Sequence, residues 1–86
     1  MIDPAKRIAD IVRTHMERIR DDHGRPMCHQ AVADHLGLSR SQIASARRGG
    51  SVVAALDIIQ AGGASPTEIA EVAYLAGRRA FPQVTP

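Results

Sequence analysis

The chain has 86 residues and a net charge of +2, which is enough sequence for one domain and excludes a second folded one. Its composition, 44% hydrophobic and 23% charged, is typical of a globular protein rather than a disordered one. Fourteen alanines stand against one Tyr, one Phe and no Trp, so the core must be built from aliphatic side chains and closely packed Ala. This composition favours helices over strands, and we expect an all-α domain.

The first residues contain no cationic segment followed by an apolar one, and no apolar run is long enough for a membrane span. The single Cys excludes an internal disulfide. We therefore expect a soluble protein of the cytoplasm.

Apolar residues recur at spacings of three and four along most of the chain, the period of helices with one buried face. Asp3-Pro4 is a helix start, with an acceptor at the N-cap and Pro at the first helical position, while Gly24 and Pro26 are breakers. The pattern predicts helices over residues 4–22, 28–36, 40–48, 51–61 and 66–79, within a domain of residues 1–80 and before a tail of residues 81–86.

Two of the predicted helices begin with a capping box, in which a Ser at the N-cap is followed three residues later by Gln or Glu. Ser39 and Gln42 form one such pair, and Ser65 and Glu68 form the other. The two helix starts at 40 and 66 are therefore expected to be well defined.

Positive charge is concentrated in one short segment. Residues 1–38 are neutral, residues 39–50 carry +3 with no acid, residues 51–77 carry −3, and the last nine residues carry +2. Ten of the eleven basic residues are Arg, the side chain suited to bidentate contacts with phosphate and guanine. A solvated helix face would explain the same charge.

The helices predicted at 28–36 and 40–48 are separated only by Gly37-Leu38-Ser39. This linker has the length and chemistry of a tight turn: a Gly for positive φ, an apolar residue to fill the elbow and a cap for the next helix. Apolar residues expected to hold the pair against the domain are Val32, Ala33, Leu36, Leu38, Ile43 and Ala46. The stretch AVADHLGLSRSQIASARRGG resembles the helix-turn-helix of the lambda repressor and Cro family of small phage and bacterial transcriptional regulators.

The resemblance is closest from His29 to Gly49 and implies a role for each matching position. In such proteins the second helix enters the major groove, and the start of the first helix meets the phosphate backbone. The implied base-reading residues are Arg40, Ser41, Gln42 and Ser45, and the implied backbone contacts are Cys28, His29, Gln30, Ser39, Arg47 and Arg48. The chain departs from the family in having His29 where Gln is common, in lacking a Ser or Thr cap before that helix, and in its short link after residue 48.

Several of these residues have a second explanation from the sequence. Gln42 also completes a capping box, Ser45 also fits a solvent-facing helix position, and Arg47 and Arg48 also fit solvated charges. Arg40 is the strongest candidate, because it lies at the exposed start of its helix with no acid nearby in sequence.

Other chemistry finds little support. His23, Cys28, His29 and His35 lack the paired spacing of a zinc site. Cys28 has no identifiable third group for nucleophilic catalysis, and the glycine pairs lack the context of a phosphate-binding loop. We expect no enzyme activity, no metal and no cofactor.

The sequence thus predicts a repressor that binds double-stranded DNA as a homodimer on a palindromic operator. The dimer surface is expected on the helix at 4–22, on the helix at 66–79 or on the tail, around Tyr74 and Phe81, and the helix at 66–79 with the tail is favoured. A helical protein-interaction module, such as an antitoxin or an adaptor, is the alternative.

Overall fold

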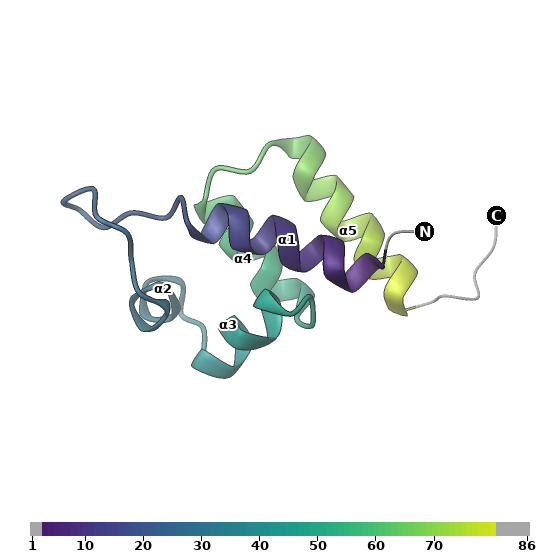
Figure 1. The fold of residues 1–86 in the computed structure, drawn as a ribbon, viewed down its shortest axis with the longest axis horizontal. Coiled ribbons are helices and arrows are strands. Elements are labelled where there is room, and N and C mark those ends of the chain that lie inside the picture. Colours follow the sequence, from purple (N-terminus) through teal and green to yellow (C-terminus); the bar gives the residue numbers. More distant parts are fainter. Residues whose placement is uncertain (1–2, 81–86) are drawn as a thin grey trace.

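A computed structural model describes residues 3–80 of the chain (Figure 1). These residues form five helices and no strand, which confirms the predicted all-α class. The helices are α1 (Pro4–Met16), α2 (His29–Leu36), α3 (Arg40–Arg47), α4 (Val52–Ala61) and α5 (Pro66–Ala80). The predicted tail lies outside the described residues, and so does Phe81.

The first helix is shorter than its sequence pattern predicts, because it ends at Met16 and not at residue 22. The chain then turns back on itself, and an isolated bridge pairs Arg20 with Pro26. Asp21 holds this turn, since its carboxylate accepts from the backbone N–H groups of His23 and Arg25, both at 2.9 Å. Ile19 is nevertheless buried. It fits the helical spacing of apolar residues because it packs in the core, although it lies after the end of the helix.

Side-chain caps define the helix starts as predicted. Asp3 caps α1, and the boxes begun by Ser39 and Ser65 are both closed. Ser51 also caps its helix, by accepting from the N–H of Ala54 at 3.4 Å. The remaining helix bounds fall within one residue of those predicted.

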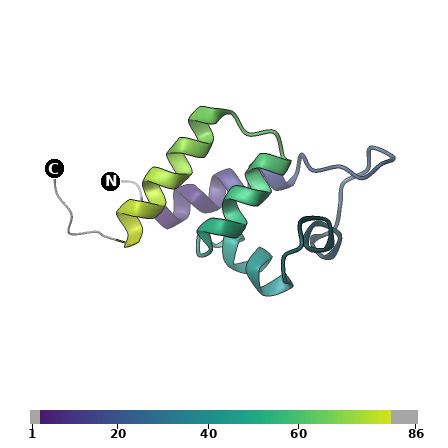
Figure 2. The ribbon, with the colours of Figure 1, turned by 180° about the vertical axis from the view of Figure 1, so that it is seen from behind.

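Helix α1 is the centre of the fold and packs against α3, α4 and α5. It lies in front of α4 and α5 in Figure 1 and behind them in Figure 2, while α2 and α3 lie together along one edge of the molecule. The core is aliphatic and includes five alanines that are at most 3% exposed, namely Ala9, Ala33, Ala46, Ala54 and Ala55. No helix among residues 3–80 is long and apolar enough to cross a membrane.

One polar side chain is buried among these aliphatic ones. His15 is fully buried, and its Nε2 donates to Oε2 of Glu68 at 2.9 Å, while its Nδ1 lies 3.4 Å from the carbonyl oxygen of Gly62. Glu68 uses its other carboxylate oxygen to accept from the N–H of Ser65 at 3.2 Å. The hydrogen bond from His15, followed by that from Ser65, lowers the pKa of Glu68 below its usual value. A single carboxylate therefore caps α5 and ties it to α1.

Two glycines with positive φ allow a direct test of how closely α3 packs on α1. Gly37 has a φ of 69° with open space where a Cβ would lie, whereas Gly49 has a φ of 79° and faces backbone atoms of Ala5. We expect Gly37→Ala to cost about 1 kcal/mol of unfolding free energy from backbone strain alone. Gly49→Ala should cost about 1–3 kcal/mol more, because the new methyl group overlaps the backbone of α1. Urea unfolding followed by circular dichroism measures both, and equal losses would contradict the close packing at Ala5.

The tie between His15 and Glu68 should make stability depend on acid pH. Because folding lowers the pKa of Glu68 from 4.5, its carboxylate stabilises the fold above that pH, and the stabilisation is lost as the pH falls through the folded-state pKa. We expect Glu68→Gln to lower the thermal midpoint at pH 7, and the difference from wild type to shrink towards pH 3. Glu17→Gln, which changes an exposed carboxylate at the C-cap of α1, is the control and should change the midpoint little. A Glu68→Gln difference that stays constant with pH would show that the carboxylate charge is unimportant.

Candidate nucleic-acid interface

The turn between α2 and α3 has the geometry that its sequence predicts. Gly37 ends α2 in the left-handed conformation, and the N–H of Leu38 donates to the carbonyl of Ala33 at 2.8 Å. Leu38 is half-buried and packs against the core. Ser39 then starts the next helix, so three residues reverse the chain and fix α3 relative to α2.

Helix α3 is fixed on its inner side and at its start. Ile43 and Ala46 are buried in the core. At the start, the N–H of Gln42 donates to Oγ of Ser39 at 3.1 Å, and the N–H of Ser39 donates to Oε1 of Gln42 at 2.8 Å. The first turn of α3 contains no acidic residue. The outward side chains of α3 therefore project from a fixed backbone, and no carboxylate lies beside them in the first turn.

The four predicted base-reading residues fall into two pairs. Arg40 and Ser41 are exposed at the start of α3. With about 100° between successive residues, Ser41 projects almost opposite to the buried Ile43 and Ala46. These two side chains have the placement that the sequence predicts for base readers.

Gln42 and Ser45 are placed differently. The amide oxygen of Gln42 is engaged in the capping box, so the bidentate contact with adenine, which needs the oxygen and the amide N–H together, is closed while the box holds. Ser45 is half-buried, and its Oγ occupies the space where a side chain at Gly50 would begin. The solvent-facing position considered for Ser45 is therefore wrong, because this side chain faces the turn between α3 and α4.

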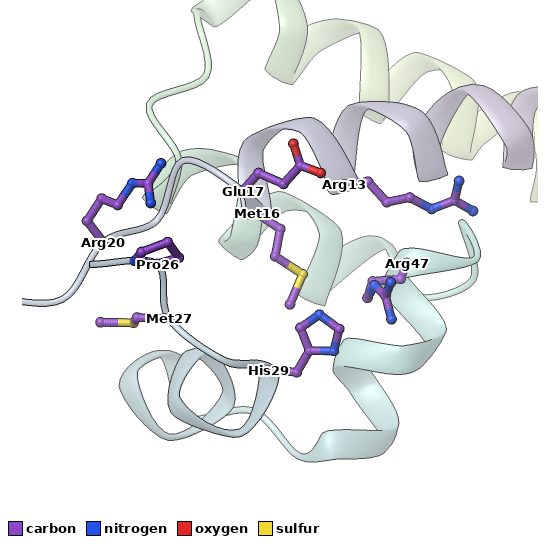
Figure 3. Close-up of a pocket in the computed structure, with 8 residues that line it drawn as sticks. All are labelled: Arg13, Met16, Glu17, Arg20, Pro26, Met27, His29 and Arg47. Carbon is purple, nitrogen blue, oxygen red and sulfur yellow. The ribbon is translucent and has the colours of Figure 1, made fainter. Parts of the chain in front are cut away.

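The predicted backbone contacts on α2 lie exposed at its start. Cys28 is the N-cap residue and makes no side-chain cap hydrogen bond, as expected for a helix without a Ser or Thr cap. Gln30 is engaged along its own helix, with Nε2 donating to Oδ1 of Asp34 at 2.9 Å. His29 is exposed and points towards Met16 of α1 (Figure 3).

The other predicted backbone contacts are at the two ends of α3. The hydroxyl of Ser39 is already engaged in its cap. Arg47 is half-buried and Arg48 is exposed at the C-cap. Arg20, Arg40, Arg47 and Arg48 make no ion pair with any carboxylate in residues 3–80.

In contrast to these four arginines, Arg7 forms a close ion pair. Arg7 of α1 binds both carboxylate oxygens of Glu71 on α5, at 2.8 and 3.2 Å. This contact holds the pKa of Glu71 below its usual range and raises that of Arg7. It joins α1 to α5.

The structure brings His29 and Arg47 together with side chains that the sequence did not indicate. They line a cavity of about 390 Å³, shown in Figure 3, whose other lining residues are Arg13, Met16, Glu17, Arg20, Pro26 and Met27. Arg13 and Arg20 belong to the segment that is neutral when charges are summed along the chain. The sequence indicates one thing about Arg13: the helical spacing of apolar residues places it on the exposed face of α1.

The remaining side chains near α2 give no sign of metal chemistry. Within the described part of the chain, no three His, Cys, Asp or Glu side chains gather as they would around a metal ion. No protein-family model matches the chain, and neither a curated protein nor a solved structure matches it.

Proposed function

We propose that this protein binds double-stranded DNA sequence-specifically and regulates transcription as a repressor of the lambda repressor and Cro type. The observation that carries the proposal is the start of α3, where Arg40 and Ser41 project from a capped and anchored helix with no acid in its first turn. A helix presented in this way fits the major groove, whose base edges offer a distinct pattern of donors and acceptors at each base pair.

The side chains divide between reading bases and holding the backbone. Arg40 can bind guanine bidentately, a contact that gives about 1–3 kcal/mol of discrimination, and Ser41 can bond to either kind of base edge. Gln42 contributes its amide N–H groups while its oxygen stays in the capping box. The phosphate contacts are assigned to Arg47 and Arg48, to the exposed start of α2 at Cys28, His29 and Gln30, and to Ser39.

A dimer completes the proposal, because a single module of this size buries little DNA surface. We place the dimer surface on α5, where Tyr74 is 62% exposed and accepts a hydrogen bond from Arg78 at 3.2 Å. Two copies would then bind a palindromic operator with half-sites about 34–36 Å apart. We propose that the protein acts in the cytoplasm and that it has neither catalytic activity nor a cofactor.

The alternative function, a protein-interaction module such as an antitoxin or an adaptor, has one observation in its favour. Val53 on α4 is 68% exposed, and with Tyr74 it places large apolar side chains in solvent. Binding of duplex DNA separates the two functions. We expect the purified chain to bind duplex DNA with an affinity that falls steeply between 50 and 200 mM salt, and to protect a palindrome in DNA flanking its own gene from cleavage. A chain that fails to bind duplex DNA even at low salt would leave only the interaction module.

Two arginine variants test the division of roles. Arg40→Ala should weaken binding to the preferred site by about 1–3 kcal/mol and relax preference at one base pair, because it removes a base contact. Arg47→Ala should weaken all sequences alike and lower the salt slope by about one unit, because it removes a phosphate contact. Titrations of the operator and of single-substitution operators at several salt concentrations measure both effects. Identical behaviour of the two variants would contradict the assignment.

The dimer surface has its own test by sedimentation equilibrium. Tyr74→Ala should raise the dimer dissociation constant at least tenfold, because truncating a central interface Tyr commonly costs 2 kcal/mol or more, that is about thirtyfold. Val53→Ala truncates the exposed apolar residue of α4 and should leave the constant unchanged. A wild-type chain that is monomeric both free and on DNA would overturn the dimer, and an effect of Val53→Ala alone would move the interface to α4.

A further inference from the structure

A second depression lies beside the cavity that His29 and Arg47 line. This second space, of about 410 Å³, is lined by Arg13, Ala44, Arg47 and Arg48. Because Arg13 and Arg47 line both spaces, the two spaces lie side by side, and we call them together the α1–α3 groove. Figure 3 shows Met16 and His29 in the middle of its first part, with Arg13 and Arg47 on one side and Arg20 on the other.

The groove has a strong excess of positive charge. Four arginines line it, Arg13, Arg20, Arg47 and Arg48, against one carboxylate, Glu17. Arg13 has a neighbouring carboxylate in Asp10, but at 3.8 Å between two side chains that are each more than half exposed, and such a pair contributes little. Cationic side chains along a cleft with apolar walls focus the electrostatic field and attract anions.

The α1–α3 groove is also continuous with the proposed reading face. With about 100° per residue, Arg40, Ala44 and Arg47 project from nearly the same side of α3. Ala44 and Arg47 line the groove, so the side of α3 that carries Arg40 leads directly into it. An elongated ligand that meets Arg40 is therefore positioned to pass along the groove.

We propose that the α1–α3 groove binds phosphate groups of the DNA backbone, with Arg13 and Arg20 acting as phosphate contacts in addition to Arg47. The inference rests on the proposed function and extends the DNA interface beyond the two helices of the turn to α1 and the segment after it. A polyanion fits better than a single ion, because the arginines are distributed along the groove and are not gathered at one point. Each guanidinium offers the donor geometry that matches phosphate oxygens.

Salt-dependent titration of the full chain with a fluorescent duplex of arbitrary sequence tests this inference. Each phosphate contact adds about 0.9 to the slope of log K against log salt. Arg13→Ala and Arg20→Ala should each lower the slope by about 0.9. The fall in affinity between 50 and 200 mM salt should then be about 3.5 times smaller for each variant than for wild type. Arg13→Lys keeps the charge and should keep the slope. Glu17→Gln should tighten binding, because it removes the one carboxylate of the groove.

Arg18→Ala is the matched control, since Arg18 is exposed after the end of α1 and lines neither space of the groove, and it should leave the slope unchanged. The inference is overturned if Arg13→Ala and Arg20→Ala match this control while Arg47→Ala still lowers the slope. It is also overturned if calorimetry with inorganic phosphate shows binding that these variants lose while their DNA slopes stay at the wild-type value, which would make the groove a site for a free anion. A wild-type chain that binds no duplex at 50 mM salt overturns the proposed function, and the groove inference with it.

Discussion

The close approach of helices through small side chains is the constraint on which the rest of this structure depends. A chain of this length with almost no aromatic residues cannot fill wide gaps between helices, so the helices must approach until their backbones nearly touch. Gly49 lies against the backbone of Ala5, Gly62 lies against the carbonyl of His15, and five alanines are buried in the core. The alanine content is therefore a condition for the fold and not only a helix propensity.

This packing positions the candidate interface through α1. The contact at Gly49 fixes the end of α3 against the start of α1, while Ile43 and Ala46 fix its middle in the core. The capping box then holds its first turn, which leaves little freedom for the backbone that carries Arg40. The tie from His15 to Glu68 secures α5 on the other side of α1, well away from α3. Stability and presentation of the interface thus depend on separate sets of contacts.

The sequence was sufficient for features that local chemistry determines. Capping residues and the turn at Gly37 could be predicted because each depends on a few neighbouring residues, and the buried faces followed from helical spacing. The predicted end of α1 was wrong, because Ile19 continues the apolar period although it is buried outside the helix. The turn that follows depends on hydrogen bonds to the carboxylate of Asp21. The partner of His15 could not be predicted, because Glu68 is distant in sequence. Arg13 and Arg20 of the α1–α3 groove were missed for the same reason, since a linear sum of charge does not show which side chains share a surface.

The engagement of Gln42 in the capping box limits how selectively α3 could read bases in the proposed interface. For Gln42 to recognise adenine with both its oxygen and its amide, the hydrogen bond from the N–H of Ser39 to that oxygen would first have to break, and one such bond contributes about 0.5–1.5 kcal/mol. That loss offsets much of the 1–3 kcal/mol that a bidentate base contact provides. The base pair facing Gln42 would then be read weakly, and the protein would tolerate variation there while remaining strict where Arg40 makes contact. Among natural operators, the position that varies most within the half-site would mark the residue that the helix needs for its own stability.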